Sequence, residues 1–226
     1  MIKNTRRTQR GETSLTRARI VAEAIALLDT KGESGLTFRA LAAALATGAG
    51  AIYFHVADKD DVLNAACDAI VAPALDAAAK GATPRERLRT IGLGLFDAID
   101  AHPWVGTELA RAPGTMPMMR IVEAVGQEVS AMDVAPATLW SGASALCSYI
   151  LGVAGQNAAN ARLGQERGIG RAAFLDELAH RWSQLDAGTY PFTRSIAEQL
   201  RVHDDRADFL AGIDLILDGM AARRSR

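Results

Sequence analysis

Apolar residues recur at helical spacing along most of the chain, and this periodicity limits the fold more than any other feature. In the segment 16–32 they follow one another three or four positions apart, as on one face of an α-helix. No segment shows the sustained alternation of apolar and polar residues that is typical of a half-buried strand. An all-α fold is therefore predicted.

Four helices are predicted within the first 70 residues. The first follows Thr16 and ends at Gly32, and the second begins at Thr37, whose hydroxyl can cap it. A tight turn of small residues leads to a brief helix over 51–56, and Asp58 caps a longer fourth helix. This order is that of a helix-turn-helix unit, in which the second short helix enters the major groove of DNA. A helical hairpin without a DNA-binding role would give the same pattern.

Beyond Pro73 the predicted helices are longer and are separated by Pro and Gly, which is typical of a helical bundle. Their predicted ranges are 84–101, 103–111, 116–132, 136–163, 171–187 and 205–223. The polar, glycine-rich segment 164–170 is expected to form a mobile loop.

Charge is distributed unevenly, although the formal net charge is only −1. Residues 1–60 hold nine Lys/Arg against six Asp/Glu, and the remainder holds sixteen against twenty. A basic N-terminal segment on an acidic body indicates a protein that contacts nucleic acid with one end, although chance would also give a difference of this size.

The residues of this N-terminal region resemble the DNA-binding domain of the tetracycline-repressor (TetR) family. The most specific matches are the runs LTFRALA at 36–42 and IYFHV at 52–56, followed by Asp58, Lys59 and Leu63. The segment 209–220 is also similar to the last helix of such regulators. The resemblance implies an N-terminal three-helix helix-turn-helix DNA-binding domain plus a C-terminal helical-bundle domain for ligand binding and dimerisation.

We accordingly expect a basic flexible arm at 1–12, the helix-turn-helix domain at 13–60 and the helical ligand-binding and dimerisation domain at 61–226. The implied function is that of a ligand-responsive transcriptional regulator, a repressor that a small molecule releases from a palindromic operator. Its implied partners are double-stranded DNA, an unidentified small-molecule effector and a second copy of the chain.

Polar and small residues of the helix-turn-helix are the candidate DNA contacts. The resemblance implies contacts to phosphates or groove edges from Thr37, Arg39, Tyr53, His55 and Lys59. The brief helix has no Arg, Asn or Gln for bidentate contact with a base. Specificity is therefore expected from DNA shape and from Thr47, Gly48, Ala49 and Ala51. Phe54 is expected in the core.

The turn departs from the family pattern at two places, which puts direct base readout in doubt. In the family, glycine usually follows the leucine that ends the second helix, but here that place is taken by Ala46. Larger residues usually begin the brief third helix, which inserts into the major groove, but here those places are taken by Gly48, Ala49 and Gly50. The arm could compensate by entering a minor groove or following phosphates, and a solvated tail is the alternative. Its basic residues are Lys3, Arg6, Arg7 and Arg10.

The body mixes apolar and aromatic residues with occasional polar ones, as small-molecule pockets do. Candidate lining residues are Phe96, His102, Trp104, Met116, Met119, Trp140, Cys147, Gln156, Asn157 and Trp182. The pair His102 and Trp104 is preferred because it joins two helices, and the amides of Gln156 and Asn157 come second because buried amides need partners. Each residue has an alternative interpretation as ordinary core or surface.

Apolar stripes on the helices at 136–163 and 205–223 are candidates for a dimer interface, which in this family is a four-helix arrangement across a two-fold axis. The stripes are Ala143, Leu146, Ile150 and Val153 on the first helix, and Phe209, Ile213, Ile216 and Leu217 on the second. Burial within a single protomer is the alternative.

Other function classes find little support in the sequence. Cys67 and Cys147 lie among apolar residues, and the four histidines lack metal-ligand spacing. The glycines of the segment 92–96 follow a helical pattern, unlike a dinucleotide-binding loop. No signal-peptide core or membrane-spanning segment is apparent. We therefore expect a cytoplasmic protein that is not an enzyme and has neither metal nor cofactor. A helical protein-interaction module without DNA binding is the main rival.

Overall fold

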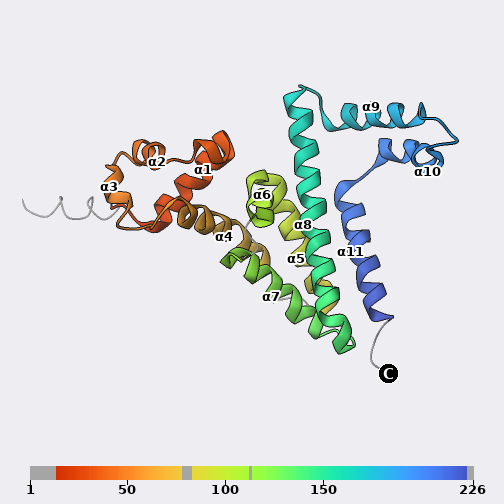
Figure 1. Cartoon of the computed structure of the whole chain (residues 1–226), viewed down its shortest axis with the longest axis horizontal. Coiled ribbons are helices and arrows are strands. Elements are labelled where there is room, and N and C mark those ends of the chain that lie inside the picture. Colours follow the sequence, from red (N-terminus) through yellow and green to blue (C-terminus); the bar gives the residue numbers. More distant parts are fainter. Residues whose placement is uncertain (1–13, 78–82, 112–113, 223–226) are drawn as a thin grey trace, which may run out of the picture.

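The computed structural model of the chain describes residues 14–77, 83–111 and 114–222. Within these ranges the regular elements are all helices, as predicted. Figure 1 shows a small N-terminal lobe joined by one long helix, α4, to a larger helical bundle. The basic arm at 1–12 lies outside the described residues.

The small lobe contains α1 (Arg17–Gly35), α2 (Phe38–Ala44), α3 (Ala49–Ile52) and the first half of α4 (Lys59–Ala77). Its core is filled by fully buried side chains such as Ile20 and Ile52. Thr16 and Thr37 cap α1 and α2 as predicted, because their hydroxyl oxygens accept hydrogen bonds from backbone N–H groups at 3.2 and 3.1 Å. The position at which each of these helices begins is therefore determined by its own capping threonine.

Several boundaries in this lobe differ from the sequence prediction. At Gly32, where φ is 64°, α1 bends and then continues to Gly35. The predicted helix 51–56 is wrong at both ends, because α3 begins two residues earlier, at Ala49, and the chain turns after Ile52. The backbone N–H groups of residues 55 and 56 bond back to the carbonyl of Ile52, which closes that turn. Pro73 lies inside α4.

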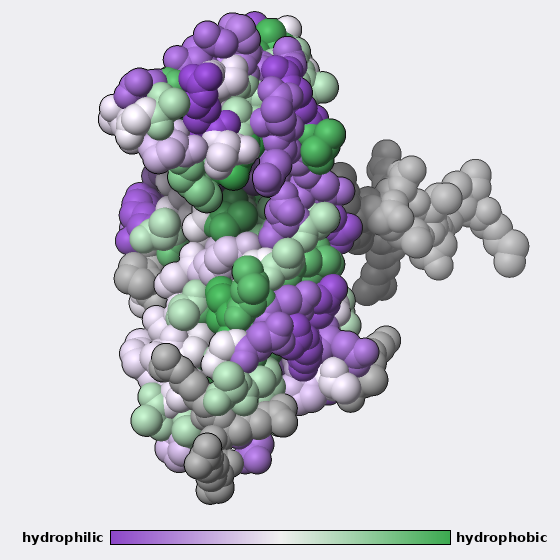
Figure 2. Space-filling view, turned by 90° about the vertical axis from the view of Figure 1, so that its right-hand side faces the viewer, coloured by the Kyte–Doolittle hydropathy of each residue, from purple (hydrophilic) through white to green (hydrophobic). Residues whose placement is uncertain are grey.

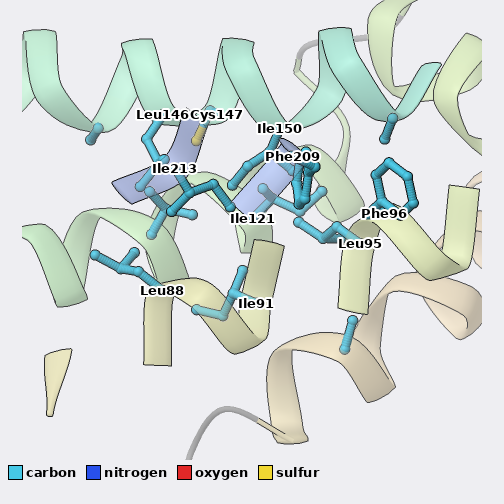
Figure 3. Packing of buried hydrophobic residues seen from close by; sticks show 14 of the residues in the cluster. Leu88, Ile91, Leu95, Phe96, Ile121, Leu146, Cys147, Ile150, Phe209 and Ile213 are labelled. Carbon is cyan, nitrogen blue, oxygen red and sulfur yellow. The ribbon is translucent and has the colours of Figure 1, made fainter. Parts of the chain in front are cut away.

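The bundle is built from α5 (Pro84–Ala101), α6 (Pro103–Arg111), α7 (Met116–Ser130), α8 (Pro136–Glu166) and α11 (Asp205–Ala221). Figure 3 shows how side chains from α5, α8 and α11 meet in its core, where Phe209 and Ile213 of α11 lie against Ile150 of α8. The rings of Phe96 and Phe209 are 4.8 Å apart. This core is filled mainly by the protein's own apolar side chains.

A helical extension projects from the end of α8 and returns to α11 (Figure 1). It consists of α9 (Arg171–Ser183), α10 (Pro191–Ser195) and the 3₁₀ helix η2 (Ala197–Val202). The last two elements are not in the sequence prediction, and α9 ends four residues before its predicted end. The expected loop at 164–170 is also shorter, because α8 continues to Glu166.

The two lobes share α4 as a structural element. Its first half, including Leu63 and Ala66, packs in the small-lobe core, and its second half, including Cys67 and Ala74, packs in the bundle. Gly94 of α5 permits this packing, because a Cβ there would lie 2.8 Å from the Cβ of Ala74. The division that we propose at residue 60 therefore lies in a continuous helix.

Candidate nucleic-acid interface and effector site

The tip of the small lobe is formed by α2, α3 and the turn after α3, and the surface of α3 within it is smooth because its exposed residues are small. Ala49 and Gly50 are exposed, and Thr47 and Ala51 are half-buried. A Cβ at Gly48 or Gly50 would meet no atom within 4 Å, and neither residue has a left-handed φ. The protein itself therefore requires glycine at neither position, and α3 leaves room for the close approach of another molecule.

Aromatic side chains stand beside this smooth surface. The rings of Phe38 and Tyr53 stack at 4.4 Å, and Tyr53 is 57% exposed. Phe54 is 90% exposed, so our placement of this residue in the core is wrong. Ile52 and Val56, four positions apart, fill the core on one side of the turn and leave Phe54 on the other side. That spacing is the sequence signal that could have placed Phe54 among the candidate contacts.

An arginine–aspartate pair holds the turn after α3 against α1. Arg17 donates two hydrogen bonds to Asp61, at 2.9 and 2.6 Å, and one to the carbonyl of His55 at 2.9 Å. The other donor to Asp61 is the backbone N–H of Ala57, at 2.9 Å. The guanidinium of Arg17 and then this N–H lower the pKa of Asp61 from 3.8 to about 2. These hydrogen bonds hold the turn after α3 in place against α1.

Positive charge is scarce on the described part of the small lobe. Residues 14–66 hold five Lys/Arg against six Asp/Glu, whereas residues 1–13 hold four against one. Arg39 is exposed and has no ion pair within the described ranges. The ammonium of Lys59 instead lies 3.0 Å from the carbonyl oxygen of Glu33 and 3.5 Å from its carboxylate. The basic character noted in the sequence therefore comes from the arm.

The candidate effector residues do not converge on one pocket in the bundle. Phe96 is buried in the core, whereas Met116 and Trp140 are exposed, Trp140 to 74%, and Gln156 is exposed as well. The secondary candidates are also dispersed: Met119 is exposed, Cys147 is buried and Trp182 is half-buried.

Three of the candidates meet at the junction of α5 and α6, next to the small lobe. Asp29 of α1 accepts a hydrogen bond from the indole N–H of Trp104, and its carboxylate contacts Nδ1 of His102, each at 2.7 Å. Nearby on α5, Asp100 accepts a hydrogen bond from the amide of Asn157 at 2.9 Å. His102 and Trp104 thus connect the bundle to the small lobe.

A cleft of about 920 Å³ opens at this junction, between the small lobe and the bundle. Its walls come from the C-terminal half of α1, from α6 and from the C-terminal half of α8. Small residues of α8, including Gly155 and Ala158, line one side, and Trp104 and Glu108 of α6 line another. This volume lies within the range of small-molecule sites.

The stripes that we predicted for dimerisation lie mostly inside the bundle. Leu146, Ile150, Ile213 and Phe209 are at most 1% exposed, so the alternative of burial within one protomer is correct for them. The opposite faces of the same helices are free. On α8 this face carries small residues such as Ser148 and Gly152, and on α11 it carries Leu215, which is 73% exposed. Figure 2 shows hydrophobic residues among hydrophilic ones on the face with α11 and the extension.

Among the described helices, α8 alone has the length and hydropathy of a membrane-spanning helix, contrary to our expectation for the sequence. Of its apolar stretch, 33% is buried inside the protomer. The core helix of a soluble protein can have the same length and composition, so α8 is weak evidence for a membrane span.

Thiol and metal chemistry have no evident site in the described ranges. Burial raises the pKa of Cys67 to about 12 and that of Cys147 to about 11, which keeps both thiols protonated. No group of three or more His, Cys, Asp or Glu residues among the described positions is arranged to hold a metal ion.

Comparison with known proteins places this geometry in a family. Residues 20–66 match the family described as bacterial regulatory proteins, tetR family, and residues 77–224 match the tetracyclin repressor-like C-terminal domain. An HTH-type transcriptional regulator of Saccharopolyspora erythraea is 28% identical over 92% of this chain and 85% of its own length. The HTH-type transcriptional repressor DrrR1 of Streptomyces coeruleorubidus is 28% identical over 95% of this chain and 81% of its own.

Solved structures agree with these matches. The transcriptional regulator SCO7222 of Streptomyces coelicolor, described as a TetR, superposes with a TM-score of 0.85 and 48% identity, covering 94% of this chain and all of its own. ActR of the same organism, solved in complex with actinorhodin, shares the fold with a TM-score of 0.74 and 22% identity, over 94% and 98% of the two chains. From its two-lobed fold and its matches over both lobes, we conclude that this chain belongs to the TetR family of bacterial transcriptional regulators.

Proposed function

We propose that the protein is a homodimeric repressor that binds a palindromic operator through two copies of the α3 tip and leaves it when a small molecule binds. The observation that carries this proposal is the tip itself, a smooth exposed helix beside an exposed aromatic residue in a domain of DNA-binding regulators. Support for repression comes from the name of DrrR1, and support for a small-molecule effector comes from the ActR–actinorhodin complex.

The proposed DNA contacts divide into two groups by chemistry. Phosphates and sugars are contacted by polar side chains around the tip, since such contacts fix the position of a protein on the duplex. They are Thr37, Arg39, Tyr53, His55 and Lys59. Bases are approached by the surface of α3, formed by Thr47, Gly48, Ala49 and Ala51, and we add Phe54 to this group. Methyl groups and an aromatic edge suit the C5-methyl of thymine.

A phosphate would compete with Glu33 for the ammonium of Lys59. In the free protein this ammonium is bonded to the backbone carbonyl of Glu33 and lies near its carboxylate. Both side chains are partly exposed, so the pair contributes little to stability and exchange for a phosphate costs little.

The arm at 1–12 supplies most of the attraction for the DNA backbone, because residues 14–66 carry no net positive charge. Its four basic residues can each neutralise a phosphate and release counterions. Deletion of residues 1–11 is expected to lower the slope of log affinity against log salt by roughly 0.9 for each phosphate that the arm neutralises. An unchanged slope would exclude the arm from phosphate contact.

Dimerisation through the free faces of α8 and α11 would place the two tips on one side of the duplex. The small residues Ser148 and Gly152 permit close approach of two α8 helices, and Leu215 supplies an apolar contact. An interface there also accounts for the hydropathy of α8 without a membrane. The two α3 helices should then lie about 34–36 Å apart, one turn of DNA.

A gel-shift experiment with DNA from upstream of the protein's own gene tests the function. The wild-type protein should shift this fragment in preference to a random duplex of equal length. Phe54→Ala should weaken the complex at least tenfold. Phe192→Ala is the matched control, because it removes an equally large exposed ring from the distant extension. Wild-type protein that shows no preference for this fragment, or Phe54→Ala that behaves like Phe192→Ala, would contradict the proposal.

Release by the effector requires coupling between the two binding events. If the effector lowers the affinity for operator by some factor, the operator must lower the affinity for effector by the same factor. Effector titrations with and without operator duplex measure this factor, and equal affinities would refute release.

A further inference from the structure

The cleft between the lobes has the dimensions of a ligand site but lies outside the core of the bundle. It measures about 920 Å³ and is bounded on one side by α1 of the DNA-binding lobe and on the others by α6 and α8. A molecule bound there would touch both lobes at once. Open space also extends above Gly155, where a Cβ would meet no atom within 4 Å.

The charges around this cleft are predominantly negative. The carboxylates that line it are Asp29, Asp100, Glu33, Glu108 and Glu166, whereas the lining cations are Lys31 and Arg162. Arg162 is paired with Glu166 at 2.8 Å. Lys59 and Arg111, which lie beside the cleft, face Glu33, and Arg111 also contacts Glu108. The remaining charges are those of Lys31, Asp29 and Asp100.

Asp29 and Asp100 are the carboxylates with the least compensation. Asp29 is bonded to Trp104 and His102, and Asp100 is bonded to Asn157, but neither has a Lys or Arg partner within the described ranges. The Glu108 side chain at the same junction is buried and is already compensated, because Arg111 contacts its Oε2 atom at 2.6 Å. Asp100 is exposed and Asp29 is partly exposed, so water solvates both, and the excess of negative charge beside an indole makes the cleft more favourable for a cation than for an anion.

We propose that this cleft binds an organic cation, namely an amine with an apolar body, whose ammonium lies beside Asp29 and Asp100. The apolar body lies along Ala158 and Gly155 of α8 and against Trp104. An ammonium group there forms charge-assisted hydrogen bonds with both carboxylates. Lys31 stands on the α1 wall, so an anionic ligand of the same shape has only one unpaired cation to meet.

Binding at this position acts directly on the angle between the lobes. The hydrogen bond that Asp29 accepts from Trp104 and its contact with Nδ1 of His102 join α1 to the bundle, and the cation competes with both for the same carboxylate. This regulatory step rests on the proposed function, because it assumes that the small lobe binds DNA. The binding step does not, and the two are therefore tested separately.

Three probes of one shape but different charge test the binding step on the full-length protein: 4-phenylbutylamine, 4-phenylbutanol and 4-phenylbutyrate. Tryptophan fluorescence of a Trp140→Phe, Trp182→Phe double variant reports on Trp104, which lines the cleft. The amine should bind at least tenfold more tightly than the alcohol, and the butyrate should bind most weakly. Equal affinities for amine and alcohol would overturn the proposal.

Two further variants locate the site. Asp100→Asn should weaken amine binding about tenfold and leave alcohol binding unchanged. Asp97→Asn, one turn earlier on α5 and paired with Arg206 away from the cleft, is the matched control and should have no effect. Gly155→Phe should fill the cleft and abolish binding of all three probes, while circular dichroism confirms an intact fold. Unchanged amine binding in Asp100→Asn or Gly155→Phe would overturn the proposed site.

A gel shift at saturating amine then tests the regulatory step. Operator affinity should change by at least fivefold in the wild type and stay constant in Gly155→Phe. An unchanged affinity with the amine bound would overturn regulation from the cleft while leaving the repressor assignment intact. Loss of all operator binding without any ligand would instead refute the proposed function.

Discussion

Replacing Asp61 with asparagine removes the charge that holds the turn after α3 against α1. The pKa of Asp61 is lowered from 3.8 to about 2, chiefly by the guanidinium of Arg17. One pKa unit corresponds to about 1.36 kcal/mol, so this shift sets an upper limit of about 2.5 kcal/mol on the contribution of the ionised carboxylate. Because Arg17 is half-exposed and solvent screens the pair, we expect Asp61→Asn to lower the free energy of unfolding by about 1 kcal/mol at pH 7.

The pH dependence of this loss follows from the direction of the shift. A carboxylate with a lowered pKa in the folded state stabilises the fold fully above its unfolded value of 3.8 and loses this contribution as the pH falls through about 2. The difference between wild type and Asp61→Asn should therefore be constant from pH 5 to 7 and vanish near pH 2. Urea unfolding followed by circular dichroism, at equal protomer concentrations, measures it.

Asp60→Asn is the matched control, because Asp60 also lies in the first turn of α4 and shares the favourable interaction with the helix dipole. It has no contact with Arg17 among the described interactions. Equal losses of stability in Asp60→Asn and Asp61→Asn would show that helix electrostatics, and not the pair with Arg17, is responsible. That result would refute our account of how the turn is held.

Three other predictions concern the turn, the interface and the cysteines. Ala46 has a φ of 50°, in the left-handed region, so the free energy of unfolding should fall in the order Gly, Ala, Val at this position. In urea unfolding, Ala46→Gly should gain about 0.5 kcal/mol and Ala46→Val should lose about 1 kcal/mol. The reverse order would contradict a left-handed Ala46. If the protein dimerises as proposed, Leu215→Glu should give monomers in analytical ultracentrifugation, whereas Met119→Glu, an exposed change on α7, should not. Dimers of both variants would place the interface elsewhere. Because the pKa of Cys67 is raised to about 12, Ellman's reagent should label it at pH 8 only after unfolding, and rapid labelling of native protein would contradict its burial.

Helix starts were the most predictable part of the fold, because they depend on local chemistry. Threonine hydroxyls begin α1 and α2, and prolines stand at the first positions of α5, α6 and α8, so each start can be recognised within a few residues of sequence. The ends were less predictable. In α8 the helix continues past Gly164 to Glu166, and the carbonyl of Gly164 accepts a hydrogen bond from the N–H of Ile169 in the turn that follows, at 3.0 Å.

The orientation of helix faces was not predictable from the sequence. An apolar stripe indicates that a face is buried but not whether it is buried by the same protomer or by a partner, and Leu146 and Ile213 proved to be core residues. The free faces carry small residues such as Gly152, which give no hydrophobic signal. The helices α10 and η2 are too short for any periodicity to appear.

At the α3 tip, the sequence predicted a short helix, but neither its bounds nor the exposure of all its side chains. Residue type suggested that Phe54 is buried, whereas the turn after Ile52 exposes it. Departure from the family pattern at Ala46 was visible in the sequence, but its left-handed φ is visible only in the structure. The residues proposed to contact DNA remain predictions.

The continuity of α4 through both cores limits how this protein can be recombined with its relatives. A hybrid regulator would have to be spliced within a helix, between Ala66 and Cys67, where one core gives way to the other. One residue inserted at that junction would rotate everything beyond it by about 100° and advance it by about 1.5 Å. Functional chimaeras should therefore tolerate exchange of whole lobes only when the helical phase across this junction is preserved.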